Sequence, residues 1–290
     1  MRLVTQTDAC VARFGYEEGI RRIARAGFDG IDLSLFDLAR AKHELLTDNW
    51  TSRVDDLLAL SRELGTPFVQ AHAPFPSIRL GDNAYNEFMA VRLRRSIEIA
   101  GRLGITAIVI HPFFASEDEE EQIAQNLAFY RSFEPLLRDS GVKIAVENLW
   151  RHDAQGRIIG GIFSRGRELA SFLDRLDPAC FTACHDVGHS GLVGEDAAAA
   201  VRAIGHHHLT TVHIHDNNHR DDQHLAPHLG LIDWEALTAA FGEINYSGDF
   251  TLEADFTLQR QPETNFDRTL RYMEATARDL MRRIEANRAV

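Results

Sequence analysis

The sequence predicts a (β/α)8 barrel, a closed ring of eight parallel strands surrounded by helices. Short β-branched apolar runs alternate with longer segments of helical periodicity, and this alternation repeats eight times in 290 residues. The runs lack an in-out polar alternation, as expected for strands buried on both faces. An open doubly wound sheet is the competing fold, but no glycine-rich phosphate-binding turn follows the first run. We therefore expect one barrel domain over residues 1–290.

The expected elements follow in chain order. The strand candidates are the apolar runs at 3–7, 30–35, 67–74, 107–113, 143–149, 181–187, 210–216 and 250–256. The segments between them show helical spacing, and the expected helices are 16–26, 51–64, 85–103, 119–138, 165–176, 196–205, 233–243 and 263–287. Gly27 is a plausible stop for the first helix, and Asp233 is a plausible N-cap for the seventh.

Composition is that of a globular protein and argues against some partners. With 44% hydrophobic and 26% charged residues, the chain can bury a large core. A net charge of -12 disfavours nucleic acid as a partner. Cys10, Cys180 and Cys184 form no CxxC pair, which favours a reducing compartment. No run approaches the roughly 18 apolar residues of a membrane span, so we expect a cytoplasmic protein.

Side chains able to bind metal or transfer protons follow most of the expected strands at their carboxyl ends. In a barrel these ends form the face where the loops converge on one pocket. The residues are His72, His111, Glu147, Asn148, His185, Asp186, His189, His213, His215, Asp216, Glu253 and Asp255. A lone histidine beside a proline is more often a hydrogen-bonded strand-end residue than a metal ligand. Six neighbouring strands with such ends nevertheless predict a site for metal binding or proton transfer.

The segment VHIHDNNHRDDQH (212–224) allows two interpretations. It is either an ordinary solvated loop or the rim of a metal site whose other ligands come from elsewhere in the chain. His213 lies within the strand, whereas Asp222 and His224 follow in the loop. The run at 206–208 has no such support, because it precedes the seventh strand and so belongs to the opposite side of the barrel.

Seven motifs make the chain similar to the xylose-isomerase-like barrel superfamily, which includes sugar epimerases, inosose-processing enzymes and endonuclease IV. They appear in the family's order from the third strand to the eighth: QAHAPF, IVIHPF, AVENLW, CHDVGHS, TVHIHD, DQHLAPHLGLIDW and FTLEADF. Together they are specific for the superfamily and weakly specific for any one activity.

The resemblance implies a central metal site formed by Glu147, Asp186, His213 and Glu253. In the family's ketose 3-epimerases the two glutamates also exchange the substrate proton, which makes Glu147 and Glu253 the expected catalytic residues. His189 looks like the family's substrate-contacting histidine. Endonuclease IV-like members hold three zinc ions with further ligands, so the matching positions are expected to bind substrate or additional metal: His72, His111, His189, Asp222 and His224.

Two positions depart from the family's pattern. The run often written PGEG before IDW reads Pro227-His228-Leu229-Gly230 in this chain. The ketose epimerases carry an arginine six residues after the histidine of the seventh strand, where this chain has His219, followed by Arg220. The resemblance therefore does not imply an identical substrate preference.

The expected function is that of a metal-dependent isomerase or epimerase acting on a sugar, keto-sugar or cyclitol. Three carboxylates and an imidazole suit Mn²⁺, Mg²⁺ or Co²⁺, and also Zn²⁺. Such an ion polarises a carbonyl, so that a positioned carboxylate can remove the adjacent proton and leave an enediolate. Removal on one face and return on the other gives epimerisation, whereas transfer between adjacent carbons gives isomerisation.

Three alternatives remain open at this point. A lyase or dehydratase would use the same enolate chemistry, and an endonuclease IV-like zinc phosphodiesterase would act on abasic DNA. The acidic charge balance argues against the nuclease, as does the bulky ENLWRHDAQG in place of that enzyme's small, glycine-rich run. A non-catalytic ligand-binding barrel is the third, although no central ligand is lost. Since family members often dimerise or tetramerise, a homo-oligomer is compatible with the sequence.

Overall fold

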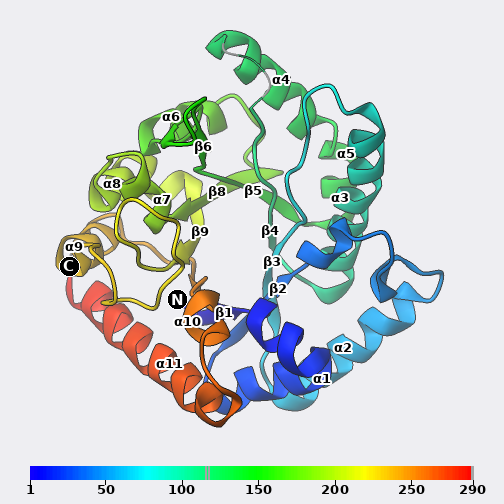
Figure 1. Ribbon diagram of the computed structural model, residues 1–290, viewed down its shortest axis with the longest axis vertical. Helices are drawn as coiled ribbons and strands as arrows, with labels where there is room; N and C mark the ends of the chain where they lie inside the picture. Colours follow the sequence, from blue (N-terminus) through cyan, green and yellow to red (C-terminus); the bar gives the residue numbers. More distant parts are fainter. Residues whose placement is uncertain (115, 117, 289–290) are drawn as a thin grey trace.

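A computed structural model describes residues 1–114, 116 and 118–288, and eight parallel strands within these residues close into a barrel (Figure 1). Neighbours around the ring follow chain order, and the first strand pairs with the last. The strands are β1 (Leu3–Gln6), β2 (Gly30–Ser34), β3 (Phe68–His72), β4 (Ala107–Val109), β5 (Lys143–Glu147), β8 (Phe181–Asp186), β9 (Leu209–Ile214) and β10 (Asp249–Leu252). The predicted (β/α)8 fold is confirmed.

Helices surround the strands and cover their outer faces (Figure 1). The longer ones are α1 (Asp8–Ala26), α2 (Trp50–Leu64), α3 (Asn83–Leu103), α4 (Glu119–Arg131), α5 (Glu134–Ser140), α6 (Gly166–Leu173), α8 (Ala197–His208), α9 (Trp234–Glu243) and α11 (Glu263–Ala286). Short elements lie in the connections: η1 (Phe36–Ala39), η2 (Glu44–Leu46), α7 (Val187–Leu192), α10 (Asp255–Gln259) and the hairpin strands β6 (Trp150–His152) and β7 (Ile158–Gly160).

Both predicted helix signals lie where the sequence placed them. Gly27 ends α1 in a left-handed conformation with φ of 104°, a region that glycine enters without a steric penalty. The Asp233 carboxylate accepts a hydrogen bond from the Ala236 amide at 3.0 Å and so caps α9.

Three details differ from the predicted elements. The helix expected over 119–138 is two helices, α4 and α5, because Pro135 near the start of α5 has no amide hydrogen to continue the earlier helix. The first helix begins at Asp8 rather than Tyr16 and includes a non-helical residue at Gly15. The β6–β7 hairpin was not predicted, since strands of three residues are too short to show periodicity.

Apolar side chains pack between the barrel and its helices, and most strand residues are buried. All three cysteines are free and buried. Among the described residues, no helix combines the length and apolar character needed to cross a membrane.

Candidate metal centre

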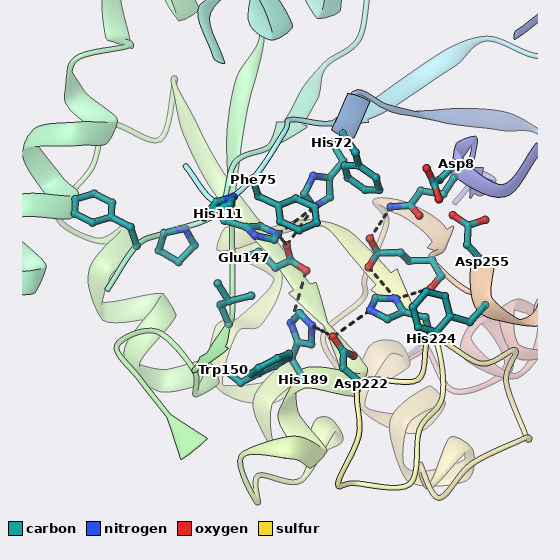
Figure 2. Close-up of a pocket in the computed structure, with 18 of the residues that line it drawn as sticks. Asp8, His72, Phe75, His111, Glu147, Trp150, His189, Asp222, His224 and Asp255 are labelled. Carbon is teal, nitrogen blue, oxygen red and sulfur yellow. Dashed lines mark hydrogen bonds and ion pairs between the residues drawn. The ribbon is translucent and has the colours of Figure 1, made fainter. Parts of the chain in front are cut away.

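A cavity of about 610 Å³ opens at the carboxyl-terminal ends of the strands (Figure 2). It is lined by seven of the nine residues predicted to form the site: His72, His111, Glu147, His189, Asp222, His224 and Glu253. The other two, Asp186 and His213, are fully buried and each lies beside residues that line the cavity. The barrel therefore brings all nine predicted residues to one place.

The central group consists of Glu147, Asp186, His213 and Glu253, one each from or next to four barrel strands. One donor atom from each lies within 4.8 Å of the others. His213 Nδ1 is 2.9 Å from Glu147 Oε1, 3.0 Å from Glu253 Oε2 and 3.9 Å from Asp186 Oδ2. Protein oxygen and nitrogen ligands bind Zn²⁺ at about 2.0–2.2 Å, so these separations suit donors arranged around one ion.

A second group shares Glu147 and adds His72 and His111. Glu147 Oε2 lies 2.8 Å from His111 Nε2 and 3.6 Å from His72 Nε2, and the two Nε2 atoms are 3.1 Å apart. Despite the short distance to His111, the geometry gives this buried oxygen no hydrogen bond to any described residue. A buried carboxylate oxygen that faces two imidazole nitrogens without a hydrogen bond is suited to coordinate a cation.

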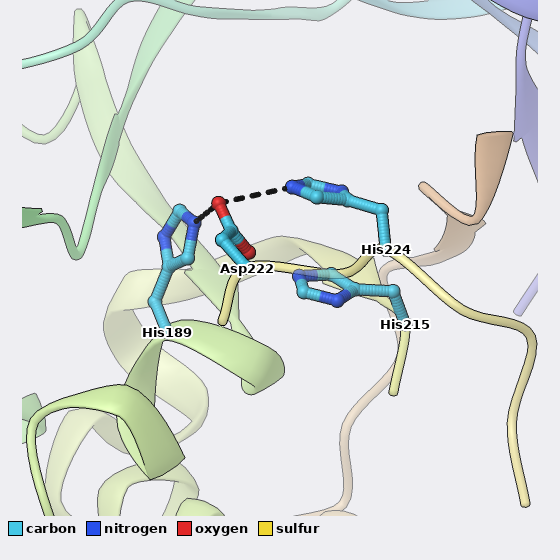
Figure 3. Close-up of side chains that lie close together, drawn as sticks. All are labelled: His189, His215, Asp222 and His224. Carbon is cyan, nitrogen blue, oxygen red and sulfur yellow. Dashed lines mark ion pairs between the residues drawn. The ribbon is translucent and has the colours of Figure 1, made fainter. Parts of the chain in front are cut away.

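The third group contains His189, Asp222 and His224, with His215 beside them (Figure 3). Asp222 Oδ2 is 3.4 Å from His189 Nε2 and 3.2 Å from His224 Nε2. His215 stacks on His224 with ring centroids 4.0 Å apart, and its Nε2 lies 2.9 Å from Asp186 Oδ1. His215 therefore connects the central group, through Asp186, with the third group, through His224.

Three of the histidines are held in the tautomer that a metal ligand requires. The Nδ1 atoms of His72, His189 and His224 lie 2.8, 2.8 and 2.9 Å from the carbonyl oxygens of Ala73, Asn148 and Glu253. Because a carbonyl oxygen only accepts, each Nδ1 carries the hydrogen. When the ring is neutral, Nε2 then has a lone pair on the side of the neighbouring carboxylate, available to a cation between them.

Polar side chains beneath His213, which the sequence analysis did not single out, position its ring. Its Nε2 atom lies 3.0 Å from the Gln70 amide nitrogen and 4.0 Å from Asp32 Oδ2. Gln70 also accepts hydrogen bonds from the hydroxyls of Thr211 and Thr251. The available signal was the polar Asp32 and Gln70 inside two mainly apolar runs, GIDLSL and PFVQAHAP.

The charges of the site favour a bound cation. Burial opposes ionisation of Glu147, but the neighbouring His213 and His111 hold the pKa of its carboxyl well below the usual range. Burial likewise opposes protonation of His224, yet Asp222 and Glu253 raise the pKa of its imidazole to about 10. Protons on the imidazoles thus balance the carboxylates that a metal ion would otherwise neutralise. The carboxylate and imidazole donor set fits a divalent cation.

Other polar residues predicted at the strand ends have supporting positions. Asn148 donates to the Asp186 carbonyl and accepts from the Asp186 amide, which holds β5 and β8 together at the site. Asp216 accepts hydrogen bonds from the Ile232 amide and the Trp234 indole, and so orders the loop that carries Asp222 and His224. The run at 206–208 precedes β9, on the side of the barrel away from the cavity, as expected.

The two departures from the family's pattern affect loops beside the site. His219 packs against α7, where a Cβ atom built on Gly191 would lie 2.4 Å from its ring. Neither His219 nor Arg220 is among the described residues that line the cavity. His228 has φ of 71° and its ring packs edge-on against Trp234.

Comparison with known proteins places this geometry in a family. The profile of the family described as xylose isomerase-like TIM barrel matches residues 20–276. The chain belongs to this family. The resemblance inferred from the sequence motifs is therefore confirmed.

Among curated proteins, ML2432 of Mycobacterium leprae, described as an uncharacterized protein, is 25% identical over 256 residues, 82% of this chain and 83% of the relative. Among solved structures, a D-tagatose 3-epimerase-like protein superposes with a TM-score of 0.76 at 20% identity and covers 99% of both chains. A 3-keto-D-glucoside 4-epimerase from E. coli gives a TM-score of 0.72 at 18% identity, covering 96% of this chain and 99% of its own. At such identities the two structures share the fold.

The protonation of the site predicts that metal binding displaces protons. Burial opposes protonation of His213, but Cys184, Glu253 and Glu147 raise the pKa of its imidazole well above the usual value. The protonated form of His213 is therefore favoured in the metal-free protein, and its proton must be released for the ring to coordinate an ion. We expect Mn²⁺ binding to release protons and its affinity to rise as the pH rises, measured by titration calorimetry in buffers of different ionisation enthalpy.

The exposed His207 provides the matched control for this measurement. His207→Ala should leave proton release and affinity unchanged, whereas His213→Ala should weaken Mn²⁺ binding at every pH. Binding to the wild-type protein without proton release, and with the same affinity at pH 6 and pH 8, would contradict the prediction.

Proposed function

We propose that the chain is a metal-dependent isomerase or epimerase of a keto-sugar or cyclitol. One observation carries the proposal: Glu147 and Glu253 each place one carboxylate oxygen about 3 Å from His213 Nδ1, at 2.9 and 3.0 Å, and both glutamates line the same cavity. The fold shared with sugar epimerases supports the same reaction class.

The four residues of the central group would hold the divalent ion, since their buried donor atoms lie close together with the appropriate chemistry. A bound ion supplies Lewis acidity, which lowers the pKa of a proton next to the substrate carbonyl. His189, His72 and His111 line the same cavity and offer imidazole nitrogens to the hydroxyl groups of the substrate.

The two glutamates come from separate parts of the ring, which supports proton transfer from different sides. Glu147 ends β5 and Glu253 follows β10, and in the barrel these strands are separated by β8 and β9. Glu253 Oε1 accepts a hydrogen bond from the Gln6 amide, whereas Glu147 Oε2 accepts none from the described residues. We propose that one glutamate removes the proton and the other returns it on the opposite face, which is epimerisation.

This proposal predicts that Glu147→Gln and Glu253→Gln each lower turnover by about 100-fold or more, because an amide cannot take up the proton. The measurements are the interconversion of the two substrate epimers and the exchange of their α-protons with D₂O, both followed by NMR on the Mn²⁺-supplemented protein. Glu243→Gln is the matched control, since Glu243 is exposed and pairs only on the surface with Arg202.

Circular dichroism should show that both site variants remain folded. Proton exchange at the wild-type rate in both variants would remove the two glutamates from the mechanism. Loss of exchange in Glu243→Gln would show that the substitution acts through stability rather than through the site.

A second candidate, a zinc phosphodiesterase acting on abasic DNA, is favoured by one observation. The second and third groups supply the further ligands that a three-metal cluster requires, and Glu147 belongs to both the central and the second group. Clusters of metal ions suit phosphate displacement. The net charge of -12 opposes a polyanionic substrate, and Trp150 with its hairpin occupies the region beside the cavity.

Metal content and substrate together separate the two candidates. We expect the protein purified without chelator to contain about one Mn²⁺ or Mg²⁺ per chain by elemental analysis, and to leave abasic-site DNA uncut. Three zinc ions per chain with cleavage of that DNA would contradict the sugar-enzyme proposal. His111→Ala is informative here, because it should abolish the nuclease and leave an ion in the central group.

A further inference from the structure

Both acidic and apolar side chains line the cavity above the metal centre. Asp8 and Asp255 lie on one side and Trp150 on the opposite side (Figure 2). Asp8 and Asp255 follow β1 and β10, which are adjacent in the barrel. The loops after β4 and β5, also adjacent strands, instead contribute Pro112, Phe113, Phe114, Leu149 and Trp150. These five apolar residues, called the apolar wall below, have no role in the proton transfer proposed above.

The apolar wall is held in place by its surroundings. The buried Asn126 side chain accepts a hydrogen bond from the Phe113 amide at 3.1 Å and donates to the Phe113 carbonyl at 3.0 Å. The Phe113 ring packs edge-on against Phe129. Phe114 lies over Gly161, where an added Cβ atom would be only 2.3 Å from the ring. Packing and hydrogen bonds thus fix the positions of Phe113 and Phe114 in the wall.

Trp150 adds an indole ring to this surface. It begins the β6–β7 hairpin and packs edge-on against His152, with ring centroids 4.9 Å apart. Its indole Nε1 is buried and has no hydrogen-bond partner among the described residues.

The cavity is larger, and part of its lining is more apolar, than an unsubstituted monosaccharide requires. A volume of about 610 Å³ lies in the range of pockets that enclose drug-sized ligands. Hydroxyl groups buried against the apolar wall would lose their hydrogen bonds to water, because the side chains of Pro, Phe and Leu carry no polar group. A flat apolar group would instead gain from burial and from stacking.

We propose that the substrate is a sugar derivative with a flat apolar substituent, of the aryl-glycoside class. The sugar lies over the carboxylates and histidines, and the substituent lies against Phe113, Leu149 and Trp150. The identity of the sugar end rests on the proposed function, whereas the substituent follows from the apolar wall alone.

The test compares two ligands that differ only in the substituent: phenyl and methyl 3-oxo-β-D-glucopyranoside. Their dissociation constants are measured by titration calorimetry with the Mn²⁺-loaded full-length protein. We expect the phenyl compound to bind at least tenfold more tightly. Trp150→Ala and Phe113→Ala should remove most of this preference and leave the affinity for the methyl compound within about twofold.

Two further variants make the outcome specific. Trp150→Phe keeps a flat ring and should retain the preference even if Trp150→Ala unfolds. Tyr272→Ala removes a half-exposed ring on α11, away from the cavity, and should have no effect. Equal affinity of the wild-type protein for the two compounds, or a preference that survives in both Ala variants of the wall, would overturn the proposal.

The same two compounds separate this inference from the proposed function. NMR reports whether their α-protons exchange with D₂O. Exchange of both compounds without any preference for phenyl would refute the aryl substituent and leave the epimerase proposal standing. A phenyl preference without exchange would refute the epimerase proposal and leave the apolar subsite standing.

Discussion

The burial of the Glu147 carboxylate is the constraint on which the rest of the site depends. Its side chain is 1% exposed at the end of a strand that is itself enclosed by neighbours. A carboxylate in such surroundings costs several kcal/mol unless positive charge or hydrogen bonds compensate it. The surrounding strands supply His72, His111 and His213, so that the compensation comes from the same residues that can bind metal.

The barrel turns this local constraint into one pocket. Parallel strands in a closed ring all end on the same face, so side chains far apart in the sequence meet there. Different loops then contribute different kinds of side chain to this face. The loop after β9 brings Asp222 and His224 over the site, and the loops after β4 and β5 form the apolar wall. The loops therefore add both polar and apolar side chains to the residues at the strand ends.

Much of this arrangement was predictable from the sequence. The apolar runs indicated the strands, and the polar residues at their ends indicated the site. This follows because the carboxyl ends of all strands in a parallel barrel lie on the same face. The predictable part ended where position depends on tertiary contacts. Asp32 and Gln70 lie inside mainly apolar runs, and their role is visible only in the structure, where Gln70 contacts both Asp32 and His213. The β6–β7 hairpin was too short to leave a periodic signal, and the break at Pro135 divided a pattern that reads as continuous.

The central claim is that the strand-end carboxylates and His213 form a metal-binding centre, and anomalous diffraction from crystals grown with Mn²⁺ tests it most directly. The account predicts the strongest anomalous peak within about 2.0–2.3 Å of donor atoms from Glu147, Asp186, His213 and Glu253. Absence of a peak at this position, with His213 still hydrogen-bonded directly to the glutamates, would contradict it.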